Sequence, residues 1–120
     1  MAARYHDAIA AIPCLELAHD PDYAKRTWQS YCLRVLPGAP ADRTELMRRL
    51  LHDGVATRRG VMAIHEEPSY AAPGLAETLP HTEAAARDVI MLPLFPGLTD
   101  AQQDYVIDRL VAACALPAAA

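Results

Sequence analysis

The stretch WQSYCLRVL, residues 28–36, has the clearest strand pattern in the sequence. Tyr31, Leu33 and Val35 alternate with smaller or polar residues, and a period of two places such side chains on one face of a sheet. The segment PGAP at 37–40 follows directly and predicts a loop, because proline and glycine interrupt regular structure. We therefore expect one face of this strand to be buried.

Helical patterns lie on both sides of this strand. In these patterns, apolar residues recur at positions i, i+3, i+4 and i+7. The pairs Asp42–Glu45 and Thr99–Gln102 resemble the capping pairs found at helix N-termini. Gly54 is suited to the position that follows a helix C-terminus. The patterns predict helices at residues 1–12, 42–53, 82–89 and 99–114. Shorter extended segments are expected at 15–17, 55–59 and 90–94, with an irregular stretch over 60–80.

This order of elements predicts one domain over residues 1–120. We expect an α+β fold in which a small, mostly antiparallel sheet has helices packed on one face. Residues 1–12 would form a lead-in helix, and residues 113–120 would form a frayed tail. The length of 120 residues is sufficient for one hydrophobic core.

The composition is that of a soluble globular protein, with 52% hydrophobic and 22% charged residues. The net charge of −4 disfavours a nucleic-acid partner, because phosphate backbones are bound mainly by Lys and Arg. The longest apolar stretch, residues 89–98, is too short to span a bilayer, and no signal peptide is visible. We expect a cytoplasmic protein without a membrane partner.

The cysteines do not indicate a metal site. Cys14, Cys32 and Cys114 are far apart in the sequence and form no C-x-x-C pair. We expect free, buried thiols in a reducing compartment and no bound metal.

Two polar segments are candidates for chemistry. His65 is followed by Glu66 and Glu67, so it is either a general acid/base oriented by a carboxylate or part of a solvated turn. Arg58 and Arg59 are adjacent on an expected strand and should point to opposite sides. One of them could bind a carboxylate or phosphate, or could form a salt bridge at the rim of the domain.

Five short motifs in a fixed order resemble the C-terminal small domain of the DegT/DnrJ/StrS-type sugar aminotransferases, which depend on pyridoxal phosphate and have the aspartate-aminotransferase fold. These motifs are WQSYCLR at 28–34, a helix from 42 followed by GVATR at 54–58, H-x-x-P-x-Y at 65–70, LPHTE at 79–83 and LPLFPGLT at 92–99. The resemblance covers nearly the whole chain but only the last third of a typical family member.

The resemblance implies an enzyme that moves an amino group from an amino acid to a nucleotide-linked keto sugar, as a homodimer. In the family, the large N-terminal domain supplies the Schiff-base lysine. That domain is absent here, and the single lysine, Lys25, does not match the family's lysine motif. We therefore expect no catalytic or cofactor-binding residue in this chain and no activity in isolation. The substrate-binding candidates are Arg58, His65, Arg59 and Tyr31.

Gly60 and Val61 depart from the family pattern, which often has a histidine and an aromatic residue here, near the substrate. The departure leaves several alternatives open. The chain could be part of a split enzyme, a non-catalytic interaction module or a remnant. The complete protein could also be a sugar dehydratase of the same family, because some members have a histidine in place of the lysine.

Overall fold

The computed structural model describes residues 1–70 and 78–115 of the chain. The described part contains four α-helices, four β-strands and one 3-10 helix, arranged as an α+β domain. In chain order they are α1 (Ala2–Ile9), β1 (Leu15–Leu17), β2 (Tyr31–Val35), α2 (Arg43–His52), β3 (Arg58–Arg59), η1 (Ile64–Glu66), α3 (Pro80–Asp88), β4 (Val89–Leu92) and α4 (Asp100–Ala115).

The four strands form one antiparallel sheet in the order β1-β2-β4-β3. In the register between the two central strands, Tyr31 lies opposite Leu92, and Leu33 lies opposite Ile90. All four of these residues are buried, so the alternation in residues 28–36 predicted the buried face correctly. The antiparallel α+β architecture expected from the sequence is confirmed.

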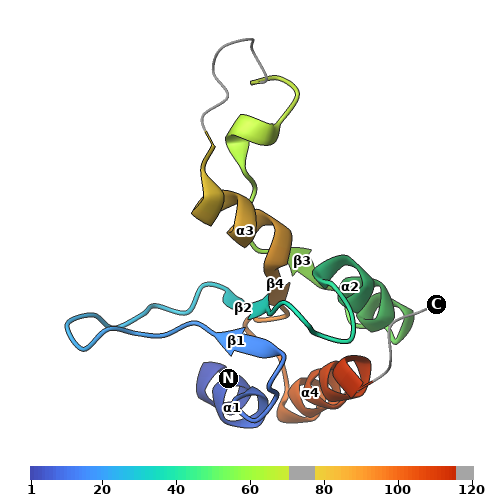
Figure 1. Ribbon diagram of the computed structural model, residues 1–120. Helices are drawn as coiled ribbons and strands as arrows, with labels where there is room; N and C mark the ends of the chain where they lie inside the picture. The colour runs from blue at the N-terminus through green and yellow to red at the C-terminus, as the bar shows by residue number, and fades with distance from the viewer. Residues whose placement is uncertain (71–77, 116–120) are drawn as a thin grey trace.

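Helices α1, α2 and α4 cover the buried face of the sheet (Figure 1). Helix α3 is the exception, because it rises on the other side of the sheet and leads directly into β4 (Figure 1). The large residues that are almost fully buried come from both layers: Tyr5, Ile9, Tyr31, Leu33, Leu46, Leu50, Ile90 and Leu110. One core therefore joins both ends of the chain.

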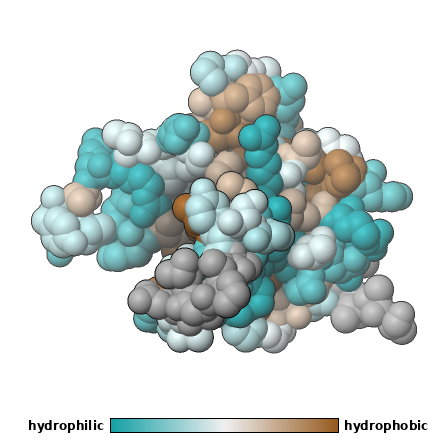
Figure 2. All heavy atoms as spheres, turned by 90° about the horizontal axis from the view of Figure 1, so that it is seen from above, coloured by the Kyte–Doolittle hydropathy of each residue, from teal (hydrophilic) through white to brown (hydrophobic). Residues whose placement is uncertain are grey.

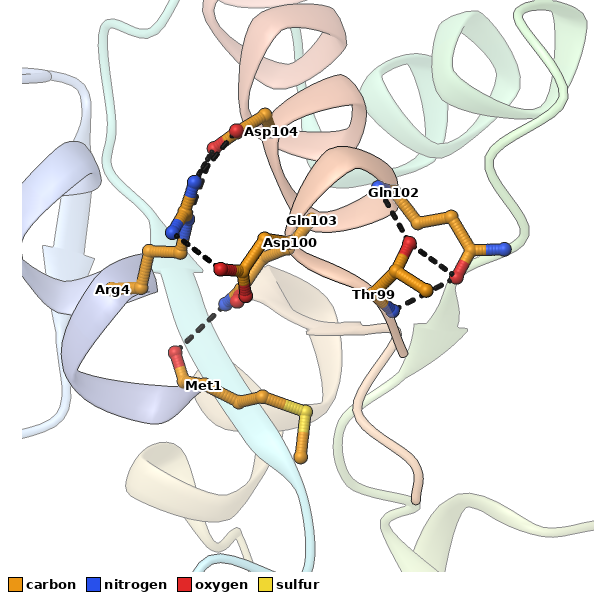
Figure 3. A network of polar contacts seen from close by, with 7 residues as sticks. All are labelled: Met1, Arg4, Thr99, Asp100, Gln102, Gln103 and Asp104. Carbon is orange, nitrogen blue, oxygen red and sulfur yellow. Dashed lines mark hydrogen bonds and ion pairs between the residues drawn. The ribbon is translucent and has the colours of Figure 1, made fainter. Parts of the chain in front are cut away.

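The expected helix boundaries at α2 and α4 are explained by capping. The backbone N–H of Glu45 donates to Asp42 Oδ1 at 2.8 Å, and Gly54 has φ of +78°. At α4, Gln102 N–H donates to Thr99 Oγ1, and Thr99 N–H donates to Gln102 Oε1 (Figure 3). The reciprocal capping box is complete only at α4, because the Glu45 carboxylate binds Arg48 and Arg49 instead.

Helix α1 is fastened to α4 by a polar network (Figure 3). Arg4 donates two hydrogen bonds from Nη2 and one from Nε to the Asp104 carboxylate, and its Nη1 lies 3.4 Å from Asp100. The buried side chain of Gln103 donates from Nε2 to Met1 O at 2.7 Å. The sequence pattern did not indicate this network, since its two halves lie at opposite ends of the chain.

Several expected boundaries need correction. Helix α1 ends at Ile9, several residues before Pro13, and the expected strand over 55–59 pairs only at residues 58–59. The sequence predicted a frayed tail from residue 113, but α4 continues to Ala115. Both Ala113 and Cys114 are buried. Residues 116–120 lie outside the described part, as do residues 71–77 of the expected irregular stretch.

Candidate functional site

The two adjacent arginines of β3 lie at the edge of the sheet and line different clefts. Neighbouring residues on a strand point to opposite sides. Arg58 accordingly lines a largely apolar cleft, whereas Arg59 lines a smaller charged one. Gly60 N–H donates to Val89 O at 3.1 Å, and a Cβ at position 60 would overlap the Val89 side chain. Glycine therefore allows β3 to lie close to β4, which sets the position of both arginines.

The apolar cleft has a volume of about 740 Å³ and is formed by residues 54–58, residues 91–98 and the first turns of α4. Of the described residues that line it, Arg58 alone carries a charge. Tyr105 contributes a hydroxyl group at its rim and donates to Asp53 O at 2.8 Å. A cleft of this size, with one guanidinium group in an apolar lining, is suited to a ligand that carries one anionic group.

The charged cleft has a volume of about 380 Å³. Arg43 from the start of α2 and Arg59 from β3 line it together with Arg87 from α3. Its acidic lining residues are Glu66, Glu67 and Glu83. Arg43 was not among the candidates from the sequence, because only the packing of α2 against the sheet brings it close to Arg59.

His65 is held by a hydrogen bond to a carboxylate and does not line either cleft. Its Nε2 lies 3.2 Å from Glu83 Oε1, and the side chain is 19% exposed. The same carboxylate oxygen accepts a hydrogen bond from Leu79 N–H at 2.8 Å. The hydrogen bond from Leu79 N–H lowers the pKa of Glu83 most, and the hydrogen bond with His65 lowers it further. The partner that orients His65 is thus Glu83 of α3, and not the neighbouring Glu66 or Glu67 considered from the sequence.

Tyr31 is a core residue in this chain. It is 1% exposed and stacks against Trp28 with ring centroids 5.3 Å apart. Tyr5 packs on it at 5.0 Å. Burial raises the pKa of Tyr31 to about 12, and its hydroxyl has no hydrogen-bond partner among the described residues. Tyr31 therefore does not reach the clefts that Arg58 and Arg59 line.

The four candidates thus lie in four different places. Arg58 faces the apolar cleft, Arg59 faces the charged cleft, and His65 and Tyr31 face neither. The sequence predicted that Arg58 and Arg59 diverge, because strand geometry alone requires it. The separation of Arg58 from His65 depends on where residues 60–66 turn, and no local pattern specifies that direction.

The three cysteines are free thiols. Cys114 is buried, and Cys14 and Cys32 are half-buried. Burial raises the pKa of Cys114 to about 12, and the nearby Cys14 thiol contributes in the same direction. Within residues 1–70 and 78–115, no group of three His, Cys, Asp or Glu side chains could hold a metal ion. No helix in the described part is long and apolar enough to cross a membrane.

Solved structures of aminotransferases resemble this chain closely. DesV from S. venezuelae, solved in complex with a ketimine intermediate, is 30% identical with a TM-score of 0.80, and the match covers 96% of this chain and 30% of DesV. The sugar aminotransferase CalS13 from Micromonospora echinospora is 27% identical with a TM-score of 0.78, over 92% of this chain and 28% of CalS13.

NtdA from Bacillus subtilis, solved with bound cofactor PMP, is 28% identical with a TM-score of 0.78, over 96% of this chain and 27% of NtdA. The chain therefore spans less than a third of the length of these three structures. The model of the DegT/DnrJ/EryC1/StrS aminotransferase family matches residues 1–111. With the fold and the motif order in agreement, this chain belongs to the DegT/DnrJ/EryC1/StrS aminotransferase family.

Proposed function

We propose that this chain is the C-terminal domain of a pyridoxal-phosphate-dependent aminotransferase that acts on nucleotide-linked keto sugars. The amino donor would be an amino acid such as glutamate, and the complete enzyme would be a cytoplasmic homodimer. The observation that carries the proposal is the family match over residues 1–111, together with similar structures that include a sugar aminotransferase and a PMP complex. The free thiols are consistent with a reducing compartment.

The residues present do not fit a cofactor site on their own. A Schiff base needs an amine that is poised in a shielded pocket, where burial can lower its pKa. Lys25 is the single lysine of the sequence, and it is exposed in the loop between β1 and β2. We therefore place the reactive amine in another polypeptide segment, and we expect this chain to be inactive in isolation.

The contribution of this chain would be to bind and enclose the substrate. Arg58 is the group best placed for this role, since it is the charged residue among the described residues that line the apolar cleft, and a guanidinium group forms strong hydrogen bonds with anions. His65 would act indirectly, because its hydrogen bond with Glu83 joins η1 to α3.

Exposed apolar side chains support the proposal that another domain packs against this chain. Ile64 of η1 and the nearby residues Met62 and Tyr70 are all more than 60% exposed, and Phe95 at the apolar cleft is 48% exposed. Viewed from the side of α3, apolar surface appears in several places between polar side chains (Figure 2). Surfaces of this kind are typical of faces that another domain covers, here a large cofactor-binding domain, covalently linked or separate.

The test is reconstitution. The coding DNA on both sides of the sequence should be read for a cofactor-binding domain with a lysine motif, and that domain should be expressed with this chain. We expect amino transfer from glutamate to a nucleotide-linked keto sugar by the pair and none by this chain alone. Loss of the sugar's hydroxyl group without amino transfer would instead identify a dehydratase.

Arg58→Gln tests the proposed contact in the reconstituted enzyme. We expect KM for the keto sugar to rise at least about tenfold, since a charged hydrogen bond to the substrate would be lost. Arg48→Gln is the matched control, because Arg48 is exposed and bound to Glu45 on the surface of α2. Equal KM values for the two variants would contradict the role of Arg58.

A further inference from the structure

Arg43 is a half-buried cation, and part of its guanidinium group lacks a partner. Its Nε and Nη1 atoms are inaccessible to solvent, and neither has a hydrogen-bond partner within residues 1–70 and 78–115. Within the described part of the chain, no ion pair of Arg43 is found either. Arg34 and Arg109 also have an unpartnered Nε, but Arg34 pairs with Asp88 through Nη2, and Arg109 packs on the Tyr105 ring. A buried polar group without a partner calls for a specific explanation, and a missing ion is one of the few available.

A second guanidinium group makes the arrangement less favourable still. Arg59 lines the same cleft, and its side chain has no ion-pair partner in the described part of the chain. Burial, followed by repulsion from Arg59, lowers the pKa of Arg43. Two neighbouring cations, of which Arg43 is half-buried and Arg59 is exposed, are stabilised by an anion that lies between them. Arg43 also lies at the start of α2, where the helix dipole favours negative charge.

The acidic groups around the cleft do not supply this anion. Asp88 is bound by Arg87 and Arg34, and Glu83 is bound by His65 and Leu79 N–H. Asp42 and Asp88 attract Arg43 only through space. Glu66 and Glu67 are exposed, so water and salt screen their charge. Among the residues that the structure describes, no carboxylate is therefore bound to Arg43 or Arg59.

We propose that the charged cleft binds a small oxyanion, a phosphate or a carboxylate, between the guanidinium groups of Arg43 and Arg59. The planar guanidinium fork matches the paired oxygens of both groups, and such hydrogen bonds are stronger than neutral ones. The volume of about 380 Å³ suffices for a small ligand. The site is separate from the apolar cleft of Arg58 and does not depend on the proposed transaminase activity.

The experiment is an NMR titration of the 120-residue chain, in which the Nε–Hε signals of its arginines are followed. Inorganic phosphate and acetate are added separately, while sodium chloride keeps the ionic strength constant. We expect saturable shifts at Arg43 and Arg59, with Kd on the order of millimolar. Saturation by phosphate alone identifies a phosphate site, and saturation by acetate identifies a carboxylate site.

Arg43→Gln and Arg59→Gln should each weaken binding at least about tenfold. Arg59 lies on an exposed edge strand, so its variant remains informative even if replacement of Arg43 impairs folding. Arg48→Gln, on the exposed surface of α2, should bind as the unaltered chain does. Shifts that rise linearly with both anions, or an equal loss in the Arg48 variant, would overturn the proposal.

Discussion

The base of the molecule and the segment around η1 are built in opposite ways. In the base, α1, α2 and α4 enclose one face of the sheet, and residues such as Leu50 and Ile90 are completely buried. Around η1, Met62 and Ile64 are 66% and 63% exposed, and η1 contains no buried residue. The base is therefore a self-sufficient core, whereas the apolar surface of the second region has no partner within the described part of the chain. This difference is what the proposed function requires of a domain that has its own core and would be covered by another domain.

Two neighbouring leucines of α2 provide the strongest test of this contrast. Leu50 is fully buried, and Leu51 is 64% exposed. Leu50→Ala should lower the free energy of unfolding by about 2–5 kcal/mol, because it leaves a cavity in the core. Leu51→Ala should change it by less than ~0.5 kcal/mol. Urea unfolding followed by circular dichroism measures both, and similar losses would contradict the assignment of the core.

Gly60 should be the next most sensitive position, since it lies where the base meets the second region. Gly60→Ala should cost about 1–3 kcal/mol of unfolding free energy, because the added Cβ overlaps the side chain of Val89. Val89→Ala in the same chain should relieve part of this loss. A double-mutant cycle measures the coupling, and purely additive losses would show that the two strands do not lie so close.

The ion pairs of Glu45 in α2 should make the stability of the chain depend on pH. Hydrogen bonds from Arg48 and then Arg49 lower the pKa of Glu45 from 4.5 to about 2. Because the pKa is lowered in the folded state, the stabilisation is present above pH 4.5 and is lost as pH falls towards about 2. Glu45→Gln should therefore flatten the decline of melting temperature over this acid range. An unchanged acid profile in the variant would show that the Glu45 ion pairs do not form.

The smallest global effect is expected at Glu83. Glu83→Ala removes the acceptor for Leu79 N–H and the partner of His65. We expect little change in the global melting temperature, but roughly tenfold faster hydrogen exchange at the Leu79 amide. Glu67→Ala is a suitable control, because the Glu67 side chain is exposed and forms no hydrogen bond in the described part. Equal exchange rates in both variants would contradict the proposed positioning role.

Local patterns predicted the elements of the fold, but they could not predict which side chains meet around the candidate site residues, for a physical reason. The alternation around Tyr31 and the capping residues Asp42 and Thr99 act within a few residues, so they can be read directly from the sequence. The meeting of Arg43 with Arg59 depends instead on how a helix packs against an edge strand. The hydrogen bond between His65 and Glu83 likewise joins two elements, η1 and α3, that are separated by residues 67–79 of the sequence.

The most direct test of the account is to ask whether this chain can form a Schiff base with pyridoxal phosphate. The chain is incubated with the cofactor, reduced with borohydride and analysed by mass spectrometry after proteolysis. We expect no saturable absorbance change and no more than trace, non-specific labelling of exposed Lys25. Stoichiometric labelling of Lys25, with an absorbance band that Lys25→Arg abolishes, would show that the reactive amine lies in this chain and would contradict the account.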